Sequence, residues 1–167
     1  GFESSLSGWQ VLSNPNSGNH SSNIANIYAS STYSHSGANS FRFMSYNSAS
    51  CCGNDNTQYL ISPELSVQSG DSLVFWHRSY SSPYPETFEV GFSTTNSLLA
   101  SFDFGSSNTA SSSYAKYQTN LSGYAGMNVY IAIKYTSSYQ MYLFVDDFSG
   151  PAIADIASYK VYGGTSA

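Results

Sequence analysis

Apolar and polar residues alternate along this chain in short runs, and clusters of Ser, Gly, Asn and Pro separate the runs. A period of two is typical of half-buried β-strands, whereas an amphipathic helix needs apolar residues three and four apart. No segment shows the helical spacing convincingly, so we expect an all-β fold of eight to ten strands, a two-sheet antiparallel β-sandwich of the jelly-roll type. The predicted strands are residues 9–12, 40–44, 59–61, 72–78, 87–93, 114–120, 128–135 and 141–148.

The chain carries few charges and many aromatic side chains. Charged residues make up 9% of it and aromatic residues 16%, whereas an average soluble protein is about 25% charged. Five Lys and Arg residues are too few for the basic stripe that binds nucleic acid. No apolar run approaches the length of about 20 residues that spans a bilayer, and no signal peptide is present. We therefore expect a mature or excised domain that is secreted or lies on a cell surface, without membrane insertion.

The length of 167 residues suits one domain, which we place at residues 1–150. The remaining residues, 151–167, are predicted to form an additional edge strand near 158–162 or a linker. Three irregular stretches, at residues 15–34, 45–58 and 79–86, interrupt the strands. Long loops on a rigid sandwich commonly carry binding sites, so these stretches are candidates.

The clearest ionic feature is a set of carboxylates near the two ends of the domain. Glu3 opens the chain, and Asp146 and Asp147 close the last main strand. The first and last strands of a jelly roll are commonly neighbours, and carboxylates gathered there repel unless a cation neutralises them. Oxygen ligands favour calcium over zinc, and Ser36, Asn39 and backbone carbonyls would complete the site. The alternative is that these carboxylates are ordinary solvated groups at strand ends.

The adjacent pair Cys51–Cys52 is the most unusual local feature. Adjacent Cα atoms lie about 3.8 Å apart, below the usual disulfide range of about 4.4–6.8 Å, so a bond between the two would be strained. An oxidising compartment nevertheless favours it. The resulting apolar bump, with Asn54 and Asp55 beside it, is a candidate ligand contact. The alternative is two reduced thiols that fill space.

Aromatic residues are the remaining binding candidates. Tyr46, Tyr80 and Tyr84 lie in predicted loops, and Trp76 lies on a predicted strand. Tyr and Trp stack on the apolar faces of sugar rings while offering a polar edge. For Trp76 the alternative, a place in the sandwich core, is the stronger one.

Seven segments, taken in order, resemble the cleaved-adhesin and choice-of-anchor J domains. They are GFESSLSGW (1–9), SHSGANSFRF (34–43), YLISPELSV (59–67), LVFWHRSYS (73–81), FEVGFSTT (88–95), YQTNLSGYAGMNVYIAIKY (117–135) and FVDDFS (144–149). The resemblance implies a galactose-binding-like jelly roll, related more distantly to MAM domains and carbohydrate-binding modules. It also implies a noncatalytic domain, secreted by a bacterium or on its surface, that usually carries structural calcium.

The residues offer little for catalysis. The three histidines are scattered, and Glu86 and Glu89 should point to opposite faces of their strand, so they cannot form a glycosidase pair. We therefore expect an accessory domain of a larger secreted protein rather than an enzyme: a monomeric carbohydrate-binding module that targets its parent to a glycan or polysaccharide. The alternative is an adhesion or spacer domain that binds protein or peptide, because Tyr, Ser and Asn also dominate protein-binding loops.

Overall fold

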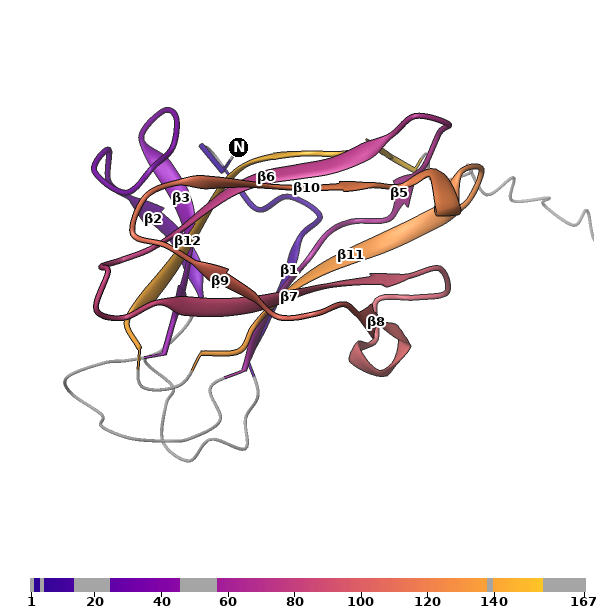
Figure 1. The fold of residues 1–167 in the computed structure, drawn as a ribbon. Helices are drawn as coiled ribbons and strands as arrows, with labels where there is room; N and C mark the ends of the chain where they lie inside the picture. Colours follow the sequence, from indigo (N-terminus) through magenta and orange to yellow (C-terminus); the bar gives the residue numbers. More distant parts are fainter. Residues whose placement is uncertain (1, 4, 14–24, 46–56, 138–139, 155–167) are drawn as a thin grey trace, which may run out of the picture.

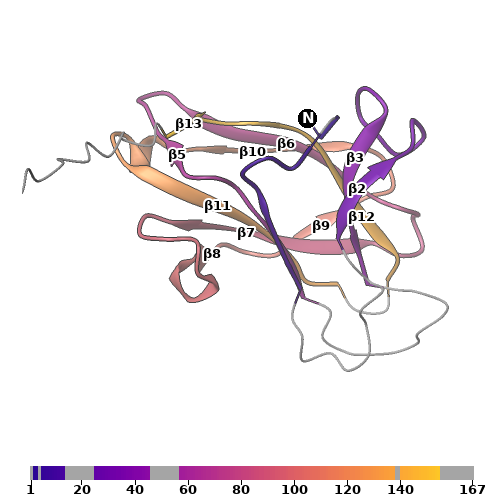
Figure 2. The same ribbon diagram turned by 180° about the vertical axis from the view of Figure 1, so that it is seen from behind.

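Two antiparallel β-sheets packed face to face make up the protein (Figures 1 and 2). The computed structural model describes residues 2–3, 5–13, 25–45, 57–137 and 140–154. In these residues the only helices are two single 3-10 turns, η1 (Leu99–Ser101) and η2 (Ser122–Tyr124). No helix in the same ranges has the length and hydropathy needed to cross a membrane.

One sheet has five strands, in the order β10-β6-β12-β3-β2. The central strands β6 and β12 are eight residues long, and β2 and β10 form the edges. The bounds are β10 (Ala115–Asn120), β6 (Ser72–Ser79), β12 (Tyr142–Ser149), β3 (Asn39–Met44) and β2 (Asn26–Ala29).

The other sheet has eight strands, and β11 is central to it. β11 pairs with β4, β5 and β7, β4 pairs with β1, β5 pairs with β13, and β7 pairs with the short β8 and β9. The bounds are β1 (Gln10–Ser13), β4 (Gln58–Ile61), β5 (Leu65–Ser66), β7 (Glu86–Ser93), β8 (Asp103–Phe104), β9 (Asn108–Ala110), β11 (Asn128–Tyr135) and β13 (Ala152–Ile153).

All eight strands predicted from the sequence are confirmed, each within one residue at either end. The predicted loop at residues 15–34 is wrong in part, because β2 lies within it and pairs with β3 at the sheet edge. The sequence on either side of β2 is too polar for an alternation of apolar and polar residues to be recognised there. The short strands β5, β8, β9 and β13 were also not predicted, and the strand expected near 158–162 lies outside the described residues.

The core between the sheets is rich in aromatic rings because alternate residues of each strand point inward. Phe41 and Phe43 on β3 pack edge to face at 4.9 Å between ring centroids, and Phe43 stacks on Tyr135 of β11 at 5.5 Å. Phe75 on β6 and Phe88 on β7 make contact between the two sheets, with their ring centroids 5.8 Å apart. Each such buried side chain stabilises the fold by about 1.5–3 kcal/mol, so these rings set the spacing of the two layers.

One carboxylate, Glu86, lies fully buried inside the sandwich. Its oxygens accept hydrogen bonds from the Tyr135 hydroxyl at 2.7 Å and the Met141 backbone N–H at 2.7 Å. Glu86 therefore links the start of β7 to the end of β11 and the residue preceding β12. Burial raises the pKa of Glu86, and these hydrogen bonds offset only part of that effect.

Replacing Glu86 with Gln tests this buried charge. Because folding raises the pKa of Glu86, its carboxyl group contributes most at low pH, and that contribution is lost as pH rises through the folded-state pKa. The free energy of unfolding of wild type minus that of Glu86→Gln should therefore fall between about pH 4 and about pH 8, measured by urea denaturation. The exposed substitution Asp103→Asn is the control. A difference that stays flat or rises with pH would contradict the assignment.

Candidate functional site

The turn at residues 34–39, which leads into β3, is held by a carboxylate from the N-terminal segment. Glu3 accepts hydrogen bonds from the backbone N–H groups of Ala38 at 3.1 Å and Asn39 at 3.3 Å. The Asn39 side-chain amide donates in return to the Glu3 carbonyl at 2.7 Å. Gly37 makes this approach possible, since a Cβ there would lie 2.3 Å from a Glu3 oxygen. Both views show the N-terminus beside the β2–β3 hairpin (Figures 1 and 2).

Two aspartates of β12 hold the other end of the same turn. Fully buried Asp146 accepts from the backbone N–H groups of His35 at 2.8 Å and Ser36 at 3.2 Å. Asp147 accepts from the Ser36 hydroxyl and from His35 Nδ1, both at 2.6 Å. Burial would raise the pKa of Asp147, but the hydrogen bonds from His35 and Ser36 outweigh it and lower that pKa.

A break in the register of β12 places the second aspartate. Between Asp146 and Ser149 the pairing with β6 shifts, and Asp147 has a φ of 47°, a left-handed conformation unusual for a non-glycine residue. Consecutive residues on a regular strand point to opposite faces. The irregularity lets both aspartates reach one turn.

The five residues predicted to bind calcium therefore all meet at this turn: Glu3, Ser36, Asn39, Asp146 and Asp147. Their carboxylates are occupied by N–H and O–H donors. In the described parts of the chain, no three His, Cys, Asp or Glu side chains form a group that could hold a metal ion. The oxygen atoms of these five residues lie on two sides of the turn.

Half-buried aromatic rings cover the outer surface of the five-stranded sheet, which we call the aromatic face. Tyr33 lies flat on Phe144 of β12 at 4.8 Å between centroids and 11° between planes, and stacks on Tyr80 at 5.3 Å. His35 stacks on Trp76 of β6 at 4.0 Å and 13°. Tyr33 directly precedes the turn at residues 34–39, and His35 belongs to it. The carboxylates that hold this turn therefore also help to position these two rings over the sheet. The half-buried aromatic residues of the face are Tyr28, Tyr33, Trp76, Tyr80, Tyr114 and Tyr142.

Both arginines of the chain lie among these rings. The guanidinium of Arg42 lies over Tyr28 at 4.2 Å and over Tyr142 at 5.1 Å. The guanidinium of Arg78 lies 5.4 Å from the Tyr33 ring and 5.7 Å from the Tyr114 ring. The aromatic face therefore combines stacking surfaces with cationic hydrogen-bond donors.

The structure brings together some of the predicted ligand-binding residues and not others. Trp76 lies on the aromatic face rather than in the core, contrary to the stronger alternative, because its neighbours Phe75 and His77 take the inward positions of β6. Tyr80 was expected in a loop but continues the sheet, with its N–H bonded to the Tyr142 carbonyl at 2.9 Å. Tyr84 is 46% exposed in the β6–β7 connection. The other candidates, Tyr46, Cys51, Cys52, Asn54 and Asp55, lie outside the described residues.

Sequence reasoning missed Tyr33, Arg42 and Arg78 as site residues. A signal for the arginines exists, since the only two in the chain stand next to aromatic residues in the segments FRF and WHRSY. Their joint position on one face depends on strand order, which the sequence does not give. Tyr33 lies in a segment without periodicity.

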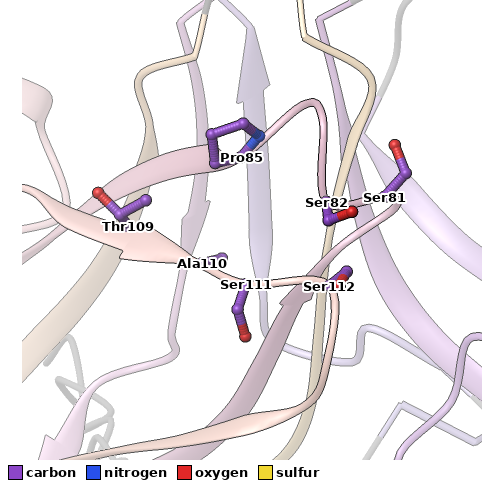
Figure 3. Close-up of a pocket in the computed structure, with 7 residues that line it drawn as sticks. All are labelled: Ser81, Ser82, Pro85, Thr109, Ala110, Ser111 and Ser112. Carbon is purple, nitrogen blue, oxygen red and sulfur yellow. The ribbon is translucent and has the colours of Figure 1, made fainter.

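A small cleft without charged lining residues lies near the β6–β7 connection (Figure 3). It has a volume of about 290 Å³ and lies between the β6–β7 connection, with Ser81, Ser82 and Pro85, and the segment 109–112. The Ser79 N–H and hydroxyl bind the carbonyls of Ser111 and Ala110 and so fix that segment beside β6. Hydroxyl groups and a proline ring therefore line a hollow next to Tyr80.

Comparison with known proteins identifies this architecture. No family model matches the sequence. The K1 cleaved adhesin domain of Lys-gingipain from Porphyromonas gingivalis W83 superposes with a TM-score of 0.71 and 16% identity, over 89% of this chain and 92% of that one. The fold is that of a cleaved adhesin domain. The resemblance predicted from the sequence is thereby confirmed.

Two further similarities extend the comparison. Hemagglutinin A of P. gingivalis is 25% identical over an alignment 177 positions long, which covers 93% of this chain but 8% of that protein. The chain thus spans less than a tenth of the length of the curated relatives it matches. The carbohydrate-binding module TmCBM61, in complex with β-1,4-galactotriose, superposes with a TM-score of 0.58 and 14% identity, over 86% and 87% of the two chains. Cleaved adhesin domains and carbohydrate-binding modules therefore share this sandwich.

The Gly37→Ala substitution tests the hydrogen bonds by which the Glu3 carboxylate holds the turn at residues 34–39. It adds backbone strain at a φ of +61° and places a methyl group against Glu3, so we expect a loss of about 1–3 kcal/mol in the free energy of unfolding. Gly70→Ala is the matched control, because its φ is +91° and nothing lies within 4 Å of the added atom. The loss beyond this control should shrink when Glu3 is also changed to Ala, as a double-mutant cycle by urea denaturation measures. Equal losses in the free energy of unfolding for Gly37→Ala and Gly70→Ala would argue against this role of Glu3.

Proposed function

We propose that this domain is a noncatalytic carbohydrate-binding module and that the aromatic face binds the glycan. The observation that supports this most directly is the group of half-buried Tyr and Trp rings that lies over one sheet. Sugar rings have apolar faces that stack on such side chains and hydroxyl edges that bond to their polar tips. The xylan-binding domain CBM22-1 of Paenibacillus barcinonensis has a similar fold, with a TM-score of 0.55 and 8% identity.

The positions of Glu86 and Glu89 favour binding without catalysis. Glu86 points into the core, while Glu89 points outward and pairs with Lys134 at 2.9 Å, so the two carboxylates do not face a common ligand. The domain would act as a monomer within a longer secreted or cell-surface protein of a bacterium. It would raise the concentration of that protein at a polysaccharide by linkage.

The second candidate is a protein- or peptide-binding adhesion domain. It is favoured by the cleaved adhesin fold and by the similarity to Hemagglutinin A. Arg and Tyr are also enriched at protein interfaces, so the aromatic face suits either ligand. Screening the domain against plant, algal and host glycans separates the two, since binding to none of them favours the protein ligand.

Fluorescence locates the glycan because the two tryptophans report different places. Trp76 lies on the aromatic face, whereas Trp9 packs between Phe2 and Phe148 at 5.8 and 4.7 Å. A glycan identified in the screen should change the emission of wild type and of Trp9→Phe but not that of Trp76→Phe. Calorimetry should show that Tyr142→Ala binds the same glycan about tenfold more weakly, equivalent to ~1.4 kcal/mol.

Tyr130→Ala supplies the control for this titration. Tyr130 is also half-buried, but it lies on the outer surface of the eight-stranded sheet, in a separate cluster with Phe102 and Phe104. This variant should bind as wild type does. A glycan that binds while leaving Trp76 emission and the Tyr142→Ala affinity unchanged would place the site elsewhere.

We also propose that a structural calcium ion binds at the 34–39 turn. The support is the chemistry of the ligands, since calcium prefers oxygen. The Glu3 carboxylate and the Asn39 amide oxygen lie on one side of the turn, the carboxylates of Asp146 and Asp147 and the Ser36 hydroxyl lie on the other, and backbone carbonyls would add to either. Each Glu3 oxygen accepts one N–H bond and retains lone-pair capacity. The ion would neutralise these carboxylates and stabilise the turn.

Chelation tests the ion. We expect the melting temperature to fall when EDTA replaces calcium, because a ligand that binds only the folded state stabilises it. Magnesium should restore less stability than calcium, since Mg²⁺ demands stricter octahedral geometry. The Asp147→Asn variant should respond less than wild type to both treatments. An unchanged melting temperature on chelation would count against the site.

A further inference from the structure

We propose that the glycan bound by the aromatic face is acidic, and that Arg42 and Arg78 bind its carboxylate or sulfate groups. The inference rests on the proposed function and deepens it, because it names the class of polysaccharide. A neutral glycan needs only the rings and the uncharged hydrogen-bonding groups around them. The arginines add positive charge, which favours a carboxylate or sulfate group over a neutral hydroxyl.

Strand register places the two arginines in one row across the sheet. Arg42 on β3 pairs with Phe144 on β12, and Phe144 pairs with Arg78 on β6. Directly paired residues point to the same side of a sheet, and neighbouring strands lie about 4.7–4.9 Å apart. The two guanidinium groups therefore extend on the same outer side, from backbones about 10 Å apart. Tyr33 lies on Phe144 between them.

As far as the structure describes the chain, each guanidinium makes one hydrogen bond within the protein besides its ring contacts. A guanidinium has five N–H donors in its plane. In the described residues, Arg42 donates from Nη2 to the Asn26 side-chain oxygen at 3.3 Å, while its buried Nε has no partner. Arg78 donates from Nε to the Ser79 carbonyl at 3.2 Å. The remaining edge donors have the planar arrangement that binds carboxylate or sulfate oxygens in pairs.

The distribution of charge over the chain supports an anionic ligand. The sequence contains only five Lys and Arg residues and has a net charge of −5. Arg42, Arg78 and Lys116 lie on this one side of the sheet, since Lys116 pairs with outward-facing Trp76. In the described ranges, the ion pairs are Lys134–Glu89 and His35–Asp147, so none of the three cations on this side belongs to one. Among the residues that the structure describes, the unpaired Arg and Lys side chains thus lie on the side of the aromatic face, and in an acidic protein such a surface is suited to an anion.

The carboxylates near this surface do not neutralise the arginines. Asp146 belongs to the next row, opposite Trp76, and its oxygens accept backbone N–H groups of His35, Ser36 and Asp147. Glu3 is likewise bound to backbone N–H groups of the turn. The negative charge is therefore directed toward the turn, at one end of the face. The three cations remain available to a ligand that lies across the strands.

Paired probes test the charge of the glycan without altering the protein. The first pair is a hexagalacturonate and its carboxyl-reduced neutral counterpart, and the second is a chondroitin sulfate hexasaccharide and the same chain after desulfation and carboxyl reduction. By calorimetry we expect the acidic member of at least one pair to bind about tenfold or more tightly than its neutral member. Its affinity should fall as NaCl is raised, because salt screens the ion pairs. The pair that discriminates identifies carboxylate or sulfate as the recognised group.

Substitution of the arginines tests the contact itself. Arg42→Gln and Arg78→Gln should each weaken binding of the acidic probe about tenfold or more, a larger loss than for any binding of the neutral probe. Arg78→Lys keeps the charge but loses the planar pair of donors, so its loss should be smaller. Lys134→Gln is the matched control, because it removes one positive charge from the other sheet. Melting curves establish that each variant is folded.

The outcomes separate the inference from the proposed function. Neutral chains that bind as tightly as acidic ones, or arginine variants that are folded and bind the acidic probe as wild type does, overturn the acidic ligand and leave the carbohydrate-binding function standing. A domain that binds none of the probes and no glycan in the wider screen loses the proposed function, and the inference falls with it.

Discussion

The hydrogen bonds between three carboxylates and the N–H groups of one turn are the constraint on which the binding surface depends. Glu3 holds one end of the turn at residues 34–39, and Asp146 and Asp147 hold the other. Such charge-assisted bonds are stronger than neutral ones. They matter here because the turn determines where Tyr33 and His35 lie. Without them, the turn would lose its bonds to the N-terminal segment and to β12, and the two rings would be held by stacking and by the Tyr114 hydroxyl, which donates to the Tyr33 carbonyl.

The same side-chain chemistry serves two purposes on the two surfaces of the five-stranded sheet. Toward the inside, Phe41, Phe43 and Phe75 bury apolar area and hold the layers together. Toward the outside, tyrosines replace phenylalanines, and arginines lie over the tyrosine rings. A hydroxyl or a guanidinium lets an aromatic surface remain in water while still offering a stacking plane. One sheet can thus be both half of a core and a recognition surface.

The sequence was sufficient for the fold class and for eight of the described strands, because the alternation of apolar and polar residues indicates which faces are buried. It also predicted that Glu3, Ser36, Asn39, Asp146 and Asp147 would meet, but the expected reason, that the first and last strands are neighbours, is wrong. β1 and β12 lie in different sheets, and the turn at residues 34–39 connects Glu3 to the two aspartates. It could not decide whether Trp76 faces the core, because β6 carries apolar residues on both sides. The sequence could not predict that Arg42 and Arg78 lie in one row. The strand between them, β12, follows both in the chain, so their proximity depends on strand order.

Phe2 and Glu3 give the N-terminal segment a mechanical role. Phe2 is buried against Trp9 and Phe41, and the next residue is bonded to the turn that carries two rings of the aromatic face. Tension applied to the chain ahead of these residues would load that packing and those bonds before it reached any strand. A pull strong enough to extract the two residues would release the turn while leaving the sheets paired. The aromatic face would then lose its arrangement, and with it ligand binding, before the sheets unfolded.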